Sequence, residues 1–99
     1  PAEYALYQNY PNPFNPTTQI RFDLPENSTV KITVYDLLGT EIVTLVNGIM
    51  NAGQQEVTWN SRNESGRDVA SGVYLLRIDA RSETSGRQHA ATQKMILIR

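Results

Sequence analysis

Hydrophobic and polar residues alternate along most of the chain with the period of two that is typical of half-buried β-strands. In residues 18–24, 30–35 and 73–80, nearly every second side chain is apolar, and most of those between are polar or charged. The stretch 95–98 is apolar at every position, which predicts a strand covered on both faces. The whole pattern predicts seven strands, at residues 3–8, 18–24, 30–35, 41–46, 54–59, 73–80 and 92–98.

Turn-forming residues separate these segments. Pro25 ends the second strand, and Gly39 in the DLLG segment of residues 36–39 is expected to close a hairpin, because glycine readily adopts a positive φ. Further loops are expected at residues 48–53, at residues 60–68 and at Ser85–Gly86.

Seven short strands without a helical period predict an all-β fold, an antiparallel seven-stranded immunoglobulin-like β-sandwich, with a small barrel as the alternative. The length of 99 residues suits one domain, spanning 1–99, in which residues 1–9 lead in from an upstream segment. Residues of one parity in the strands are the expected core: Ile20, Phe22, Ile32, Val34, Trp59, Leu76 and Ile78.

The segment YPNPFNPTT at residues 10–18 breaks the strand pattern. Its three prolines remove three backbone donors and restrict the residues before them, so neither a helix nor a central strand forms there. We expect a rigid corner in which Tyr10 and Phe14 plug the end of the sandwich, with direct recognition by another protein as the alternative.

Composition excludes several kinds of partner and site. The chain has no cysteine, so it forms neither a disulfide nor a thiolate zinc site. Its formal charge is −1 with interspersed signs, which predicts no nucleic-acid or membrane-surface binding, and no apolar run approaches a membrane span. The chain starts at Pro1 rather than Met, as an excised piece of a longer protein does, so any export signal is expected upstream.

Candidate catalytic and ligand sites are few. His89 is the single histidine and is expected in solvent beside the 85–88 turn, which predicts no enzymatic activity. Oxygen-bearing residues in the 60–68 loop suggest a calcium site, but a turn closed by Asn and Ser side chains fits their spacing better, so no metal or cofactor is expected. Sugar binding is an alternative function, with exposed aromatic rings as its candidates: Tyr4, Tyr7, Tyr35 and Trp59.

Four motifs in order resemble those of type IX secretion C-terminal sorting domains of type A. They are YPNPF (Tyr10, Pro11, Asn12, Pro13, Phe14), VYDLLG ending at Gly39, ASGVY with Gly72 and Tyr74, and KMILIR (Lys94, Met95, Ile96, Leu97, Ile98, Arg99). The 59–74 segment also resembles the immunoglobulin-like module of flagellar hook-capping proteins, with Asn60 and Asn63 where acidic residues are common.

The sorting-domain resemblance implies a function without catalysis. Such a domain sits at the C-terminus of a larger secreted cargo and directs it through the type IX translocon across the outer membrane. The implied partners are that translocon, its outer-membrane shuttle and peptidase components, and the attached cargo. The resemblance implies a secreted or cell-surface protein from which a peptidase usually removes the domain.

Each motif also has a purely structural interpretation. Gly72 can be a backbone requirement before its strand, and Tyr74 a core residue with a satisfied hydroxyl. The KMILIR run can be an ordinary edge strand, or an exposed edge that pairs with a receptor by strand addition. A passive immunoglobulin-like spacer is the remaining alternative for the whole chain.

Overall fold

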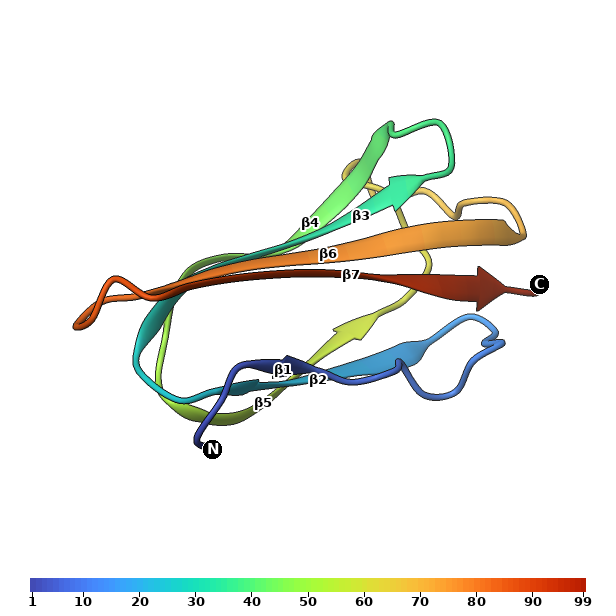
Figure 1. Ribbon diagram of the computed structural model, residues 1–99. Helices are drawn as coiled ribbons and strands as arrows, with labels where there is room; N and C mark the ends of the chain where they lie inside the picture. Colours follow the sequence, from blue (N-terminus) through green and yellow to red (C-terminus); the bar gives the residue numbers. More distant parts are fainter.

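Two antiparallel sheets face each other in the computed structural model, which describes residues 1–99 (Figure 1). One sheet has three strands in the order β1-β2-β5, and the other has four in the order β4-β3-β6-β7. The strands are β1 (Ala5–Leu6), β2 (Thr18–Leu24), β3 (Ser28–Asp36), β4 (Glu41–Met50), β5 (Gly53–Trp59), β6 (Gly72–Ser82) and β7 (Gln88–Leu97). The predicted seven-stranded sandwich is therefore confirmed, and the structure contains no helix that could span a membrane.

The largest differences between the observed and predicted strand boundaries are at three places. The first strand keeps only Ala5 and Leu6, because the continuous ladder with β2 covers only these two residues and is followed by a single bridge between Tyr10 and Gln19. The fourth strand continues to Met50 along β3, so the predicted 48–53 loop shrinks to two residues. The last strand begins at Gln88, because its pairing with β6 extends to Arg81.

The core lies between the sheets and is built by alternate strand residues. All seven predicted core residues are at most 1% exposed. The other buried apolar side chains are Phe14, Leu24, Val30, Tyr74, Ala80, Met95 and Leu97. Pairing of β3 with β6 is in regular register, Ile32 opposite Ile78 and Val34 opposite Leu76, which stacks the inward residues of the two central strands side by side.

The β3–β4 hairpin forms as its sequence predicts. Gly39 has a φ of 84°, and its amide donates to the carbonyl of Asp36 at 3.1 Å. The Asp36 carboxylate accepts the amides of Leu38 at 3.0 Å and Thr40 at 2.9 Å, which closes the turn. Glycine is needed here because an L side chain at this φ is strained.

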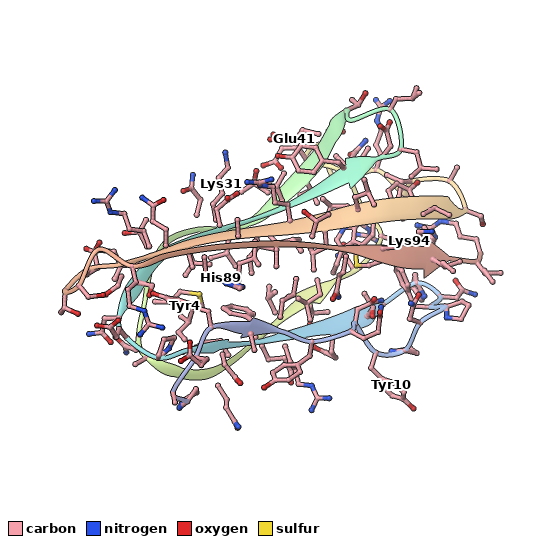
Figure 2. The ribbon with its side chains drawn as sticks, in the orientation of Figure 1. Tyr4, Tyr10, Lys31, Glu41, His89 and Lys94 are labelled. Atoms are coloured by element: carbon pink, nitrogen blue, oxygen red, sulfur yellow. The ribbon has the colours of Figure 1, made fainter.

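His89 lies in a different place from the one predicted. It is part of β7 and half-buried, and its ring stacks on that of Tyr4 with centroids 5.4 Å apart (Figure 2). The Nε2 atom is buried without a hydrogen-bond partner. The prediction of a solvated turn histidine is wrong because β6 and β7 remain paired past this position.

Candidate functional site

The four sequence motifs meet at one end of the sandwich. Asp36, the first residue of the DLLG segment, pairs with Tyr74, and Gly72 pairs with Leu97 near the end of the last strand. Phe14 forms an isolated parallel bridge with Leu97. In Figure 1 the β3–β4 hairpin, the loop before β2 and the C-terminus accordingly lie at the same end of the molecule. Residues far apart in sequence therefore form one structural unit.

An aromatic cluster fills the core beneath this end. The ring of Trp59 lies 5.7 Å from that of Phe14 and 5.3 Å, edge to face, from that of Tyr74. The Trp59 indole donates to the carbonyl of Arg62 at 3.0 Å, and the Tyr74 hydroxyl donates to the carbonyl of Ala70 at 2.6 Å. Burial raises the pKa of Tyr74. Tyr74 is thus a core residue with a satisfied hydroxyl, as the structural interpretation predicts.

Tyr10 and Phe14 have different roles, although both were expected to plug the sandwich. Phe14 is 2% exposed and does so. Tyr10 is 72% exposed and points away from the core (Figure 2). Only its backbone is fixed, by hydrogen bonds of 3.0 Å and 2.8 Å with Gln19. The plug prediction is therefore wrong for Tyr10, because the backbone bridge to Gln19 turns its side chain to solvent.

The YPNPF segment closes the edge of β7. The amide of Phe14 donates to the carbonyl of Ile96 at 2.9 Å, and the amide of Ile98 donates to the carbonyl of Phe14 at 3.0 Å. The amide of Ile96 donates to the Asn12 side chain at 2.9 Å. The three X-Pro bonds of residues 10–16 are cis. The expectation of an exposed terminal edge is wrong here, because residues 12–14 already occupy it.

The side chains of the KMILIR motif alternate between core and solvent. Met95 and Leu97 are buried, and Ile96 is half-buried. Lys94 is exposed, and Ile98 is 54% exposed. The prediction of a strand covered on both faces is therefore wrong at its end. Lys94 and Ile98 are thus the exposed residues of the motif whose side chains make no hydrogen bond or ion pair, while the exposed Arg99 does.

Arg99 holds the loop between β5 and β6, a contact that the sequence did not reveal. Its guanidinium donates to the carbonyls of Val69 at 2.6 Å and Ser61 at 2.9 Å, and lies 3.7 Å from the Asp68 carboxylate. Its amide donates to the Ser71 hydroxyl at 2.8 Å. The terminal arginine is thus a structural clamp, which the chemistry of its five donors allows.

Asn9 is a second residue that sequence analysis missed. It is buried, and its side-chain Nδ2 donates to the Thr18 hydroxyl at 3.0 Å and to the Pro11 carbonyl at 3.3 Å. Thr18 donates to the same carbonyl at 2.8 Å. A proline-rich corner leaves carbonyls without amide partners, so polar residues beside the prolines were the available signal.

Gly72 has no structural requirement for glycine. Its φ lies outside the left-handed region, and a Cβ atom added there would meet nothing within 4 Å. The backbone explanation for this glycine is therefore wrong. No other contact in the structure explains why glycine stands at the start of β6.

The 60–68 loop is closed by its own side chains. The Asn63 carboxamide oxygen accepts the Ser65 amide at 3.1 Å, the Ser65 hydroxyl at 2.9 Å and the Arg67 amide at 3.0 Å. Glu64 accepts the Thr44 amide at 3.1 Å, so its carboxylate is directed at β4. This confirms the Asn–Ser turn, and no three potential ligands gather at a metal-binding distance.

The four aromatic candidates for sugar binding do not form a platform. Trp59 is in the core, and Tyr4 stacks on His89. Tyr35 is half-buried on β3, and Tyr7 borders a shallow cavity of about 450 Å³ on the outer face of the three-stranded sheet. Its hydroxyl donates to Asp23, and that hydrogen bond raises the pKa of Tyr7. One ring already engaged by a carboxylate is a poor stacking surface for a sugar.

Known proteins share this architecture. The model of the FlgD Ig-like domain family matches residues 10–84, which include the first three motifs. Curated protein sequences gave no match.

Solved structures of low sequence identity share the fold. Dimeric latent PorU from Porphyromonas gingivalis has a TM-score of 0.75 at 22% identity, over 94% of this chain and 9% of that one. FlgD from P. aeruginosa has a TM-score of 0.63 at 23% identity, over 81% and 61%. PorZ, described as an essential surface component of the type IX secretion system of P. gingivalis, has a TM-score of 0.60 at 24% identity, over 96% and 12%. The chain thus spans less than two thirds of each of these proteins.

Proposed function

This chain belongs to the FlgD Ig-like domain family, and from that premise we propose that it is a type IX C-terminal sorting domain of type A. In this role it has no catalytic activity. It directs a covalently attached cargo across the bacterial outer membrane, and a surface peptidase then removes it. The proposed location is the cell surface or the medium, reached through the periplasm, and the proposed partners are the translocon with its shuttle and peptidase components.

The observation that carries the proposal is the joining of the first and last motifs. Asn12 and Phe14 hydrogen-bond to Ile96 and Ile98, so YPNPF and KMILIR form one folded end rather than two separate signals. A structural requirement explains Phe14, Met95 and Leu97, which are buried. It does not explain exposed residues of the same motifs, and these are available to a receptor: Tyr10, Lys94 and Ile98.

Similarity to a solved structure also supports the proposed link to type IX secretion. PorZ is described as a surface component of a type IX secretion system, and a domain like this one covers 12% of its chain. Such a domain is therefore compatible with proteins of that system. Flagellar FlgD carries the same fold, so the fold alone does not select the function.

Recognition of this end does not require strand addition to KMILIR. A new strand at Ile96 would displace Asn12 and Phe14, and exposing the Phe14 side chain would cost about 1.5 to 3 kcal/mol. Contact with the exposed side chains of the folded end avoids that cost. We therefore infer that a receptor contacts the surface of this end, with Tyr10 and Ile98 as apolar contacts.

A secretion assay tests the proposal. The domain is fused to the C-terminus of a reporter with an export signal in a type IX-competent host, and the reporter in the medium and periplasm is measured. The double variant Lys94→Ala/Ile98→Ser changes only exposed side chains of the motif. We expect the reporter to stay in the periplasm, while Arg21→Ala/Ile49→Ser, an exposed cation and an exposed isoleucine elsewhere, leaves secretion unchanged.

Two features of the structure guide the interpretation of that assay. Deleting residues 94–99 also removes the buried Met95 and Leu97, so loss of secretion after the deletion reports unfolding as well as recognition. Arg99→Ala is likewise unsuitable, because it breaks the clamp on Val69 and Ser61. Secretion that persists in the folded Lys94→Ala/Ile98→Ser variant contradicts recognition through this motif. Secretion that persists after the deletion contradicts the sorting function and favours the spacer.

A further inference from the structure

One part of the β7 edge remains open. The ladder with β6 has no bulge, and the outward groups at Lys94, Ile96 and Ile98 bond to the N-terminal segment. Residues of the same parity, Gln88, Ala90 and Thr92, therefore point their amides and carbonyls away from β6 as well. No hydrogen bond from these outward groups occurs in the structure. The last strand thus has a closed half and an open half.

The open half lacks the features with which proteins protect strand edges. Gln88, Ala90 and Thr92 are exposed and uncharged, and the segment contains neither proline nor lysine. The edge of β4 differs, because it has two register shifts and its Ile42 and Thr44 bond to Glu64. The edge strand β5 is regular but presents the acidic Glu56 on its exposed face.

A basic depression lies beside the open edge, on the outer face of the four-stranded sheet. Its volume is about 530 Å³, and its lining includes Lys31, Arg77, Asp79, Arg81, Gln88 and Ala90. Lys31 projects from this outer face in Figure 2. The register explains the gathering, because Asp79 pairs with Lys31 on one side and with Ala90 on the other, while Arg77 and Arg81 flank it on β6.

The charges in this depression are unbalanced. Asp79 forms a bidentate pair with Arg77, with both contacts at 2.9 Å, and that hydrogen-bonded pair lowers the pKa of Asp79. Lys31 and Arg81 take part in no ion pair. The depression therefore holds two cations that the chain does not neutralise, although its net charge is −1.

We propose that the open edge at Gln88–Thr92 binds an extended acidic segment of a partner protein as an added strand. Backbone hydrogen bonds to Ala90 and Thr92 hold the segment, which is the usual source of affinity in strand addition. Its outward-facing Asp or Glu side chains lie across the small Ala90 and reach Arg81, while Lys31 adds a favourable field. This surface is separate from the exposed residues of the YPNPF and KMILIR motifs and does not depend on a sorting role.

The test is a titration of the whole chain with an acetylated, amidated peptide of four Glu-Thr repeats, followed by amide NMR. We expect saturable shifts at Ala90 and Thr92, at least tenfold weaker binding of the matching Gln-Thr peptide, and weaker binding of the Glu-Thr peptide in added salt. Arg81→Gln should weaken binding at least threefold, whereas Arg21→Gln, on the other sheet, should leave it unchanged.

Ala90→Pro tests the backbone part of the proposal. Proline removes the amide that points away from β6, so it should abolish peptide binding while the β6–β7 pairing persists. The NMR spectrum of Trp59 monitors folding, and if this variant unfolds, the Arg81→Gln comparison still decides. Shifts confined to β5, equal affinity for the Gln-Thr peptide, or occupation of the β7 edge by a second copy of the chain would each overturn the proposal.

Discussion

Tyr10 and Phe14 show how two aromatic residues of one motif differ in what they do. Phe14 sits in the core against Trp59, while Tyr10 stands in solvent. Phe14 therefore serves packing, whereas the ring of Tyr10 is free for the receptor contact that we propose. Stability measurements separate them.

We expect Phe14→Ala to lower the free energy of unfolding by about 3 to 5 kcal/mol, as other buried phenylalanines do. Tyr10→Ala should change it by at most about 0.5 kcal/mol, because the ring is exposed and only the backbone is bonded. Urea unfolding followed by Trp59 fluorescence measures both. A large loss in Tyr10→Ala would show that its ring packs on the fold.

Tyr74→Phe tests the hydroxyl that bonds to Ala70. Loss of this hydrogen bond should cost about 0.5 to 1.5 kcal/mol in the free energy of unfolding. Tyr35→Phe is the matched control, since its hydroxyl has no partner in the structure and should change little. Equal losses in both variants would mean that the bond to Ala70 does not stabilise the domain.

At the scale of elements, the turn between β6 and β7 is tied to the turn between β2 and β3. Glu26 accepts the hydroxyls of Thr84 at 2.8 Å and Ser85 at 2.9 Å and lies 3.7 Å from the Arg87 guanidinium. These hydroxyls, Thr84 first, lower the pKa of Glu26 from its ordinary value of 4.5. The carboxylate form is therefore the one that the folded turn favours.

This shift predicts an acid-sensitive contribution to stability. A carboxyl whose pKa is lower in the folded state stabilises the fold above its unfolded pKa, and the stabilisation is lost as the pH falls through the folded pKa. The difference in stability between the natural protein and Glu26→Gln should therefore be present at pH 7 and shrink below about pH 4.5. Urea titrations at several pH values measure it.

The control for this prediction is Glu56→Gln, which removes an exposed carboxylate without a hydrogen-bond partner. Its stability difference should not follow that of Glu26→Gln across the same pH range. A Glu26→Gln difference that stays constant from pH 7 to pH 3 would contradict the assignment of the shift to the turn.

Closure of the β7 edge by YPNPF is also testable at this scale. Asn12→Ala removes the acceptor of the Ile96 amide, so exchange of that amide with deuterium should accelerate several-fold. Asn12→Asp keeps an acceptor oxygen and should preserve slow exchange. If both variants exchange like the natural protein, the Asn12 contact does not protect the edge.

Across the whole molecule, the sequence pattern correctly predicted the features that depend on residues close together in the chain. Strand parity placed Phe22 and Ile78 in the core because alternation is a local property. The sequence-based predictions failed for Tyr10, where prolines interrupt the alternation, and for His89, where the length of a hairpin depends on pairing between two strands. The same limit applies to function, because the exposed side chains of a motif are identified only after the structure shows which of its side chains are buried.

The contacts of Arg99 and Asn12 could not be predicted from the sequence for another reason. Asn12 bonds to Ile96 across 84 positions, and Arg99 bonds to Ser61 across 38. Neither pairing leaves a periodic signal, and each uses a side chain whose ordinary place is in solvent. In the sequence, the end of the sandwich at which the four motifs meet was therefore visible only as four separate motifs.

The hydrogen bond that the Ile96 amide donates to Asn12 also has a consequence for the order of folding during synthesis. Residues 10–14 leave the ribosome before the strand that they close has been made, so Phe14 has no buried site while the middle of the chain is being translated. Contacts of such sequence separation form slowly, since the intervening chain must first be brought together. This end of the sandwich consequently forms only after residues 94–99 have been made, and a chain that stops before them leaves part of β6 unpaired and Phe14 without its buried site.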